Sequence, residues 1–119
     1  MTKKTINSES NNKMIEIANN YFVAWNAHNT KELRLLFAHD IHLKDWEINE
    51  YGIENVLLAN QKIFTNVPEI KAEIIELGVG SNKVIAQIKI HLNEDEMIDV
   101  VDVLEIKNNL IQSIQAYKC

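Results

Sequence analysis

The sequence contains few of the residues that mark a secreted, thiolate-bound or nucleic-acid-binding protein. Cys119 is the only cysteine among the 119 residues, so there is neither a disulfide framework nor a clustered thiolate metal site. Arg34 is the only arginine and the formal net charge is −5, which argues against nucleic acid or an anionic membrane as a partner. No apolar run is long enough for a signal peptide or a membrane span, so we expect a cytoplasmic protein.

Glycine and proline are scarce as well, with three residues and one, and there is no glycine-rich phosphate-binding loop. The histidines show no metal-ligand spacing and are interpreted as surface or loop residues: His28, His39, His42 and His91. A chain of this length with 46% hydrophobic residues suits one compact domain. We predict a flexible N-terminus over residues 1–12, with Ser8 and Ser10 as possible helix caps, and a single domain over residues 13–119.

Apolar residues recur at helical spacing in three segments. The buried face of the first is predicted to consist of Met14, Ile17, Ala18, Tyr21, Phe22 and Trp25. A short second helix, capped by Thr30, has an apolar face made of Leu33, Leu36 and Phe37. A third helix begins near Ile53, carries Asn60 as the polar member of its apolar stripe, and ends at Val67-Pro68.

Elsewhere the apolar residues alternate with a period of two, which predicts β-strands. A short strand after Asp40 places Ile41, Leu43 and Asp45 on one face, and residues 46–50 then form a loop. Four antiparallel strands follow over residues 70–74, 84–91, 97–106 and 110–117, with turns at residues 78–82, 93–96 and 108–109. This order of elements predicts an α+β fold in which a curved sheet wraps against helices.

Two aspartates and one tyrosine fall in these apolar rows. Asp102 lies mid-strand, where a carboxyl group either becomes neutral through a raised pKa or requires a partner charge. Asp45 lies near a strand end, where an ordinary aspartate turns to water or caps a loop. Tyr21 lies on a helical stripe, where a tyrosine is most often a core residue whose hydroxyl finds any nearby acceptor.

Two stretches of the chain resemble the nuclear transport factor two-like (SnoaL-like) superfamily, and within it the bacterial ketosteroid isomerases. The first matches, without a gap, the family segment from an oxyanion tyrosine to a general-base aspartate: YFVAWNAHNTKELRLLFAHDIHLKD. The second matches the paired strands that carry a protonated oxyanion aspartate: MIDVVDVLEIKNNLIQSIQAY. The residues at the three matched positions are Tyr21, Asp45 and Asp102.

The resemblance implies a cone-shaped, curved mixed or antiparallel sheet around N-terminal helices, the cystatin-like α+β roll, with a deep apolar pocket. It implies that Asp45 moves a proton from the α to the γ carbon of a ketone, while Tyr21 and neutral Asp102 hydrogen-bond the dienolate oxygen. No cofactor and no metal are implied, and the expected ligand is a small hydrophobic molecule with a ketone or phenol. The other expected pocket residues are Trp25, Phe37, Asn60, Phe64 and Leu104.

A homodimer is expected from the same resemblance and from the apolar second face of the sheet, which carries Val101 and Val103. Three functions remain open: a ketone isomerase or related proton-transfer enzyme, a non-catalytic binding or dimerisation module, and a dehydratase, cyclase or epoxide hydrolase. The third is disfavoured, because epoxide hydrolases of the superfamily use an Asp-Arg-Asp set and Arg34 lies on the predicted second helix. The chain departs from the isomerases at Trp46, where they usually have proline.

Overall fold

The described part of the chain forms three helices and one six-stranded sheet. The structure, a computed structural model, describes residues 2–119, with side chains from residue 9 onward. The elements are α1 (Thr2–Asn26), α2 (Thr30–Leu36), β1 (Phe37–Lys44), β2 (Asn49–Tyr51), α3 (Ile53–Asn66), β3 (Lys71–Gly80), β4 (Lys83–His91), β5 (Met97–Lys107) and β6 (Leu110–Lys118). None of the helices within residues 2–119 is long and apolar enough to cross a membrane.

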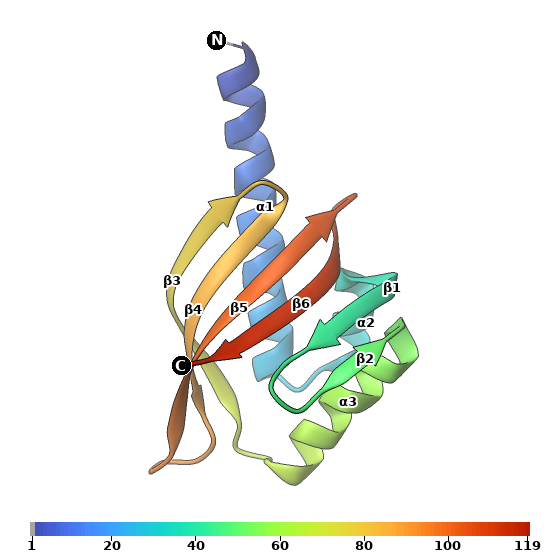
Figure 1. Cartoon of the computed structure of the whole chain (residues 1–119), viewed down its shortest axis with the longest axis vertical. Coiled ribbons are helices and arrows are strands. Elements are labelled where there is room, and N and C mark those ends of the chain that lie inside the picture. The colour runs from blue at the N-terminus through green and yellow to red at the C-terminus, as the bar shows by residue number, and fades with distance from the viewer. Residues whose placement is uncertain (1) are drawn as a thin grey trace.

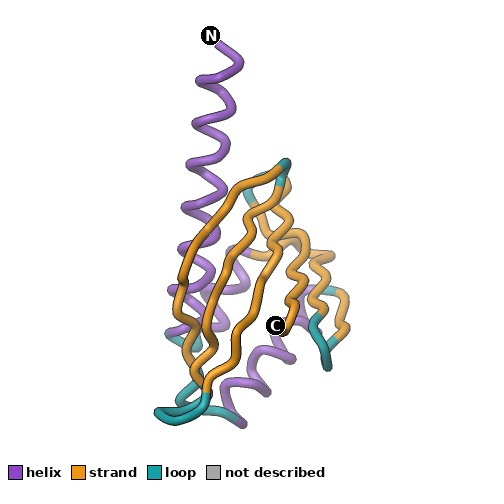
Figure 2. Tube along the Cα trace, turned by 60° about the vertical axis from the view of Figure 1, so that its left-hand side comes forward, coloured by secondary structure: helices purple, strands orange, loops and turns teal. Residues whose placement is uncertain are grey.

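The sheet is mixed and open, with strand order β2-β1-β6-β5-β4-β3. Strands β1 and β6 are parallel and all other neighbours are antiparallel. The sheet curves, α1 packs against β3 and β4, and α3 packs against β1 and β2, so the helices cover its inner face (Figures 1 and 2). The predicted α+β fold, a curved sheet against helices, is therefore confirmed.

Helix α1 carries the predicted apolar stripe, whose members from Met14 to Trp25 are all buried. The helix begins at Thr2, ahead of Ser8 and Ser10, so it starts earlier than the sequence analysis expected, and its first turns extend beyond the sheet (Figure 1). The predicted flexibility of residues 1–12 stays a prediction, and Met1 lies outside the described residues. The buried stripe fixes the position of Tyr21 against the inner face of the sheet.

The C-terminal end of α1 is joined to β3 by the side chain of Asn26. Its Nδ2 donates to the carbonyl oxygen of Ala72 at 2.8 Å, and its Oδ1 accepts from the backbone N–H of Ala72 at 2.7 Å. The prediction that Thr30 caps α2 is wrong, because the side chain of Asn29 accepts from the N–H of Glu32 at 3.1 Å and Thr30 is already helical. An asparagine before the first helical residue is a strong cap.

Three strand assignments from the sequence require correction. Strand β2 is formed by residues 49 and 50, which were expected in a loop, and by Tyr51, which follows that loop. All three residues are exposed, so the strand lacks an apolar face that a sequence pattern would reveal. Strand β3 continues through Gly80, because half-buried Leu77 and Val79 extend its alternation, so the following turn is shorter than predicted. Strand β1 also begins earlier, at Phe37, which was expected to end the second helix.

The hairpin of β5 and β6 is confirmed. Asn108 and Asn109 both have positive φ, 54° and 62°, as a two-residue hairpin turn requires. The inner face of β5 is formed, as predicted, by Ile98, Val100, Asp102, Leu104 and Ile106, of which the last four are buried. A carboxyl group therefore lies in the middle of a buried row of β5.

Candidate active site

A pocket of about 400 Å³ lies between the inner face of the sheet and helices α1 and α3. Its walls are mainly aliphatic, which suits a hydrophobic ligand, and its size is in the range that small-molecule sites occupy. The polar side chains in its lining are few, so each of them has a specific position relative to a bound molecule. They are Tyr21, Asp45, Glu47, Asn60, Asp102 and Lys118.

Tyr21 projects into the pocket from α1. Its ring packs edge-on against Phe22, with centroids 5.0 Å apart, and lies 6.1 Å from the ring of Phe37. Burial, and next the charge of Asp102, raise the pKa of the Tyr21 phenol well above its usual value. The hydroxyl therefore stays neutral and can donate a hydrogen bond.

Asp102 faces the pocket from the centre of β5. Its neighbours across the sheet are Ala86 on β4 and Ala116 on β6, and these small side chains leave space around the carboxyl group. Burial, and next the charge of Asp45, raise the pKa of Asp102 to about 7. Asp102 is thus protonated in mildly acidic solution, where it can donate a hydrogen bond.

The hydroxyl of Tyr21 and the carboxyl group of Asp102 are available to a ligand. Among the described residues, no hydrogen bond engages either group, while no fully buried side-chain polar atom lacks a partner. Both groups must therefore reach the surface of the pocket. Both groups can donate a hydrogen bond to the same oxygen atom of a bound molecule.

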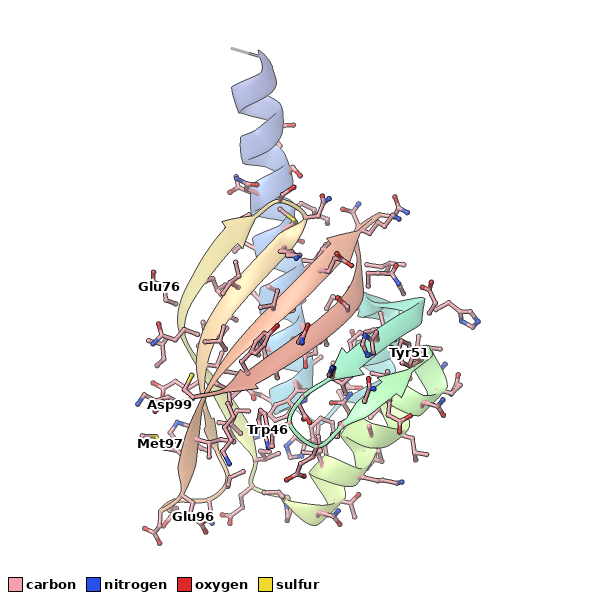
Figure 3. All side chains as sticks on the ribbon, viewed as in Figure 1. Trp46, Tyr51, Glu76, Glu96, Met97 and Asp99 are labelled. Carbon is pink, nitrogen blue, oxygen red and sulfur yellow. The ribbon has the colours of Figure 1, made fainter. Side chains whose placement is uncertain are left out.

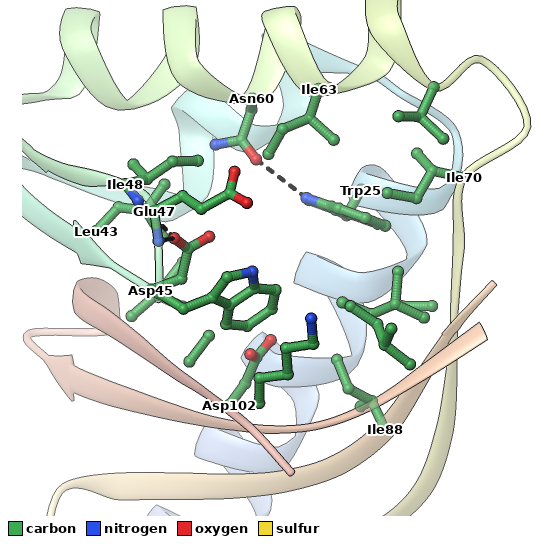
Figure 4. A pocket seen from close by; sticks show the side chains of 18 of the residues that line it. Trp25, Leu43, Asp45, Glu47, Ile48, Asn60, Ile63, Ile70, Ile88 and Asp102 are labelled. Atoms are coloured by element: carbon green, nitrogen blue, oxygen red, sulfur yellow. Dashed lines mark hydrogen bonds between the residues drawn. The ribbon is translucent and has the colours of Figure 1, made fainter. Parts of the chain in front are cut away.

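Asp45 follows β1 directly and enters the pocket from the loop that leads to β2. Its Oδ1 accepts from the backbone N–H groups of Glu47, at 2.7 Å, and Ile48, at 2.6 Å (Figure 4). Its own N–H donates to the carbonyl oxygen of Ile48 at 2.8 Å. Asp45 therefore caps its loop with one oxygen, as an ordinary strand-end aspartate does, while no described residue is hydrogen-bonded to the other oxygen.

The structure brings the three residues matched by the resemblance to one pocket. Tyr21, Asp45 and Asp102 come from α1, from the end of β1 and from β5, and all three line the same cavity. The charge of Asp45 acts on Asp102, and the charge of Asp102 acts on Tyr21. The arrangement can combine hydrogen-bond donors with a carboxylate that accepts a proton.

The other expected pocket residues divide into two groups. Trp25 and Asn60 line the cavity, and the indole Nε1 of Trp25 donates to Oδ1 of Asn60 at 3.0 Å (Figure 4). The remaining three are buried in the core and are not among the residues that line this cavity, so a contact with a ligand stays a prediction for them: Phe37, Phe64 and Leu104. Periodicity places a residue on the inner face but does not distinguish packed core from cavity wall.

Among the pocket residues that were not predicted, three carry a polar group in the side chain. Trp46, labelled in Figure 3, and Glu47 belong to the loop after β1. Lys118 ends β6, and its Nζ lies 5.7 Å from the centre of the Trp46 ring. Lys118 was accessible to sequence reasoning, because it continues the period-two row of Ile114 and Ala116 on β6. Within the part of the chain that the structure describes, no group of three or more His, Cys, Asp or Glu side chains is arranged to hold a metal ion.

Comparison with known proteins identifies the relatives of this fold. Residues 18–114 match the family model of the SnoaL-like domain. A candidate ketosteroid isomerase from Kribbella flavida superposes with a TM-score of 0.81 at 19% identity, covering 92% of this chain and 79% of that one. A candidate polyketide cyclase from Sinorhizobium meliloti gives 0.79 at 22% identity, covering 85% and 93%.

A candidate SnoaL-like polyketide cyclase from Jannaschia sp. has a TM-score of 0.80 at 12% identity, covering 91% of this chain and 86% of its own. No curated protein matches the sequence. At these identities the solved structures are similar to this chain in fold, and their names differ from one another. Any assignment of chemistry therefore depends on the pocket itself.

Proposed function

Because the chain belongs to the SnoaL-like domain family, we propose that its pocket isomerises a β,γ-unsaturated ketone through a dienolate, as a ketosteroid isomerase does. One observation carries the proposal. Tyr21, Asp45 and Asp102 converge on a single apolar pocket, although they are 24 and 57 residues apart in sequence (45 − 21 and 102 − 45). The substrate would be a hydrophobic ketone, either a steroid or a smaller molecule.

The proposed reaction begins with the ketone oxygen between the two donors, Tyr21 and protonated Asp102. The free oxygen of Asp45 removes a proton from the α carbon. The electron pair of that C–H bond forms a double bond to the carbonyl carbon, and the π pair of the carbonyl group moves onto its oxygen. The resulting dienolate oxygen is stabilised by the two hydrogen bonds. Asp45 then returns the proton to the γ carbon, which gives the conjugated ketone with no net change in protons or electrons.

The electrostatics of the pocket support different tasks for the two carboxyl groups. Asp102 is buried mid-strand and its pKa is raised to about 7, so it favours the protonated form that a donor needs. Asp45 is half-buried at a strand end, and the N–H groups of Glu47 and Ile48 require its Oδ1 to act as an acceptor. These features suit a base that faces a neutral acid across the substrate.

The test is conversion of β,γ-unsaturated ketones, followed as the rising ultraviolet absorbance of the conjugated enone. The panel should contain both steroidal and small cyclic ketones, because the pocket volume of about 400 Å³ does not select one size class. Turnover that exceeds the buffer-catalysed rate supports the proposal. A rate equal to that of buffer for every ketone in the panel would contradict it.

A non-catalytic ligand-binding module of the same fold is the second candidate. The observation in its favour is the loop cap at Asp45, which gives this residue a structural role that needs no catalysis. Such a module would bind a phenol or ketone through Tyr21 and Asp102 without exchanging a substrate proton. Binding of an unreactive phenol, together with absent turnover of every ketone, would favour the module over the enzyme.

We also propose a homodimer formed through the outer face of the sheet. On this face, apolar side chains of the adjacent strands β4, β5 and β6 form a cluster. Ile85 pairs with Val103, and Val101 pairs with Tyr117. Ile85 and Tyr117 are 40% and 51% exposed, and a twofold contact would cover them. Sedimentation should show a dimer that Val103→Glu dissociates, and a monomer at all concentrations would contradict the proposal.

A further inference from the structure

Asn60 is a buried amide whose orientation is set by its neighbours. The indole N–H of Trp25 is only a donor, so the atom 3.0 Å from it must be the amide oxygen. The carbonyl oxygen of Val56 is only an acceptor, so the atom 2.9 Å from it must be the amide nitrogen. The two contacts agree, and they fix which end of the amide is which.

The hydrogen-bonding capacity of Asn60 is only half used. An amide has two N–H donors and two acceptor positions, and the structure occupies one of each, through Val56 and Trp25. The side chain is 2% exposed to solvent, yet it lines the pocket beside the aliphatic side chains of Ile63 and Val67. One N–H and one lone pair of Asn60 therefore remain for a molecule inside the pocket.

Asn60 and Asp102 lie on opposite sides of the pocket. Asn60 enters from α3 and Asp102 from β5, and Figure 4 shows Trp25, Glu47 and Asp45 at levels between them. A ketone held by Asp102 would thus extend its hydrocarbon body toward Asn60. The other side chains that α3 and its C-terminal end contribute to the wall, Ile63 and Val67, are aliphatic. A purely apolar ligand against this helix would leave the Asn60 amide unpaired, which makes the amide a determinant of specificity.

We propose that Asn60 recognises a second oxygen function on the ligand, a hydroxyl or carbonyl group at the end remote from the ketone. This inference rests on the proposed function, since it takes the ketone oxygen to lie at Tyr21 and Asp102. The substrate class is then a hydrophobic ketone oxygenated at both ends. Asn60 binds the ligand and does not take part in the proton transfer.

The experiment compares phenols that imitate the dienolate and that differ only at their remote end. The probes are a naphthol and naphthalenediols with the second hydroxyl on the far ring. Wild type should bind the best diol about three- to tenfold more tightly than the naphthol, which is the range of one hydrogen bond in water. Dissociation constants are measured by fluorescence or calorimetric titration.

The variants must remove the amide without leaving the Trp25 indole unpaired. Trp25→Phe serves as the background, and Asn60→Leu is then added, so that two apolar side chains face each other. The diol preference should persist in Trp25→Phe and disappear in the double variant. The statistical advantage of a diol, which can bind by either hydroxyl, is the same in both proteins and cancels from the comparison.

The outcomes separate this inference from the proposed function. If the naphthol binds and Tyr21→Phe weakens it, but diols bind no better or lose affinity equally with the naphthol in the double variant, Asn60 is only a support for Trp25 and the inference is overturned. If no phenol binds, or binding ignores Tyr21, the proposed function and the inference both fail. In wild type, the side-chain amide signals of Asn60 in nuclear magnetic resonance should shift more with a diol than with the naphthol.

Discussion

The end of β1 and the centre of β5 present the same side chain, an aspartate, to the same pocket. At the end of β1 the chain turns, and the N–H groups of Glu47 and Ile48 are free to donate to Asp45. At the centre of β5 the backbone groups of Asp102 belong to a strand flanked on both sides, and alanines are its cross-strand neighbours. One carboxyl group therefore has donors around it and the other has apolar surroundings.

The difference shows that position within a strand can assign the role of a carboxyl group. Backbone donors are available where a strand ends, whereas mid-strand N–H groups are already paired in the sheet. Burial then raises the pKa of Asp102 to about 7, with a further contribution from the charge of Asp45. This fold places the end of one strand and the centre of another beside one cavity. The cavity can therefore hold one carboxyl group that accepts hydrogen bonds and one that donates them.

The largest effect on activity is expected from replacing Asp45, the carboxylate that accepts the substrate proton. Asp45→Asn keeps an oxygen that can accept from Glu47 and Ile48, so the loop should persist, but an amide cannot accept a substrate proton. The rate of ketone isomerisation should fall about a thousandfold, as loss of a general base does. Enone absorbance under single-turnover conditions measures the change.

Asp40→Asn is the matched control, because Asp40 lies on β1, the strand that Asp45 follows, is exposed and does not line the pocket. It should leave the isomerisation rate close to that of wild type. Equal rates for wild type and Asp45→Asn would mean that Asp45 only caps its loop, and its role as a base would be withdrawn.

The second test removes one of the two groups that are proposed to donate a hydrogen bond to the ketone oxygen. Tyr21→Phe removes one hydroxyl while the ring can still pack against Phe22 and Phe37. Isomerisation should slow about a hundredfold, as loss of an oxyanion donor does, and a phenol should bind more weakly. Tyr117→Phe removes an exposed hydroxyl from the last strand and should change neither quantity, so equal losses in both variants would refute the assignment.

The third test uses pH to convert the donor into a charged group. Because the pKa of Asp102 is raised to about 7, the fraction of protonated Asp102 falls as pH rises through that value. The value of kcat/KM should then fall by up to about tenfold per pH unit above this pKa. Asp102→Asn cannot ionise and should lack this decline, so parallel pH profiles for the two proteins would exclude Asp102 as the titrating donor.

The fourth and smallest effect is on stability. The folded pKa of Asp102, about 7, lies above its unfolded value of about 3.9, so between these values the native state binds more protons than the unfolded state. Stability from this group is complete below the unfolded pKa and is lost as pH rises through the folded pKa, with a limiting slope of about 1.4 kcal/mol per unit. Denaturant midpoints of Asp102→Asn should lack this slope, whereas parallel curves would indicate a solvated carboxyl group.

Much of the fold was predictable because its signals are local. The helical stripe from Met14 to Trp25 and the alternation around Asp102 each record which face is buried, and the pair Asn108-Asn109 specifies a tight turn. Strand β2 was not predictable in this way. All its residues are exposed, and its existence depends on pairing with β1, which is a tertiary contact.

The candidate site was predictable in part for the same reason. The positions of Tyr21, Asp45 and Asp102 on inner faces follow from periodicity, but their convergence follows from how the sheet curves around α1. Whether an inner residue faces a cavity or packed core depends on its neighbours from other elements. Phe64, for example, stacks on His28 with ring centroids 4.3 Å apart and is not among the residues that line the pocket.

The most direct test of the contrast between the two aspartates is the titration of the Asp102 carboxyl carbon by nuclear magnetic resonance, with Asp102→Asn to assign its signal. The account predicts a transition near pH 7, well above the ordinary value of 3.8, caused first by burial and next by the charge of Asp45. In Asp45→Asn the transition should move to lower pH, because that charge is gone. A transition at the ordinary value in wild type would contradict the central claim that this pocket holds a neutral acid opposite its base.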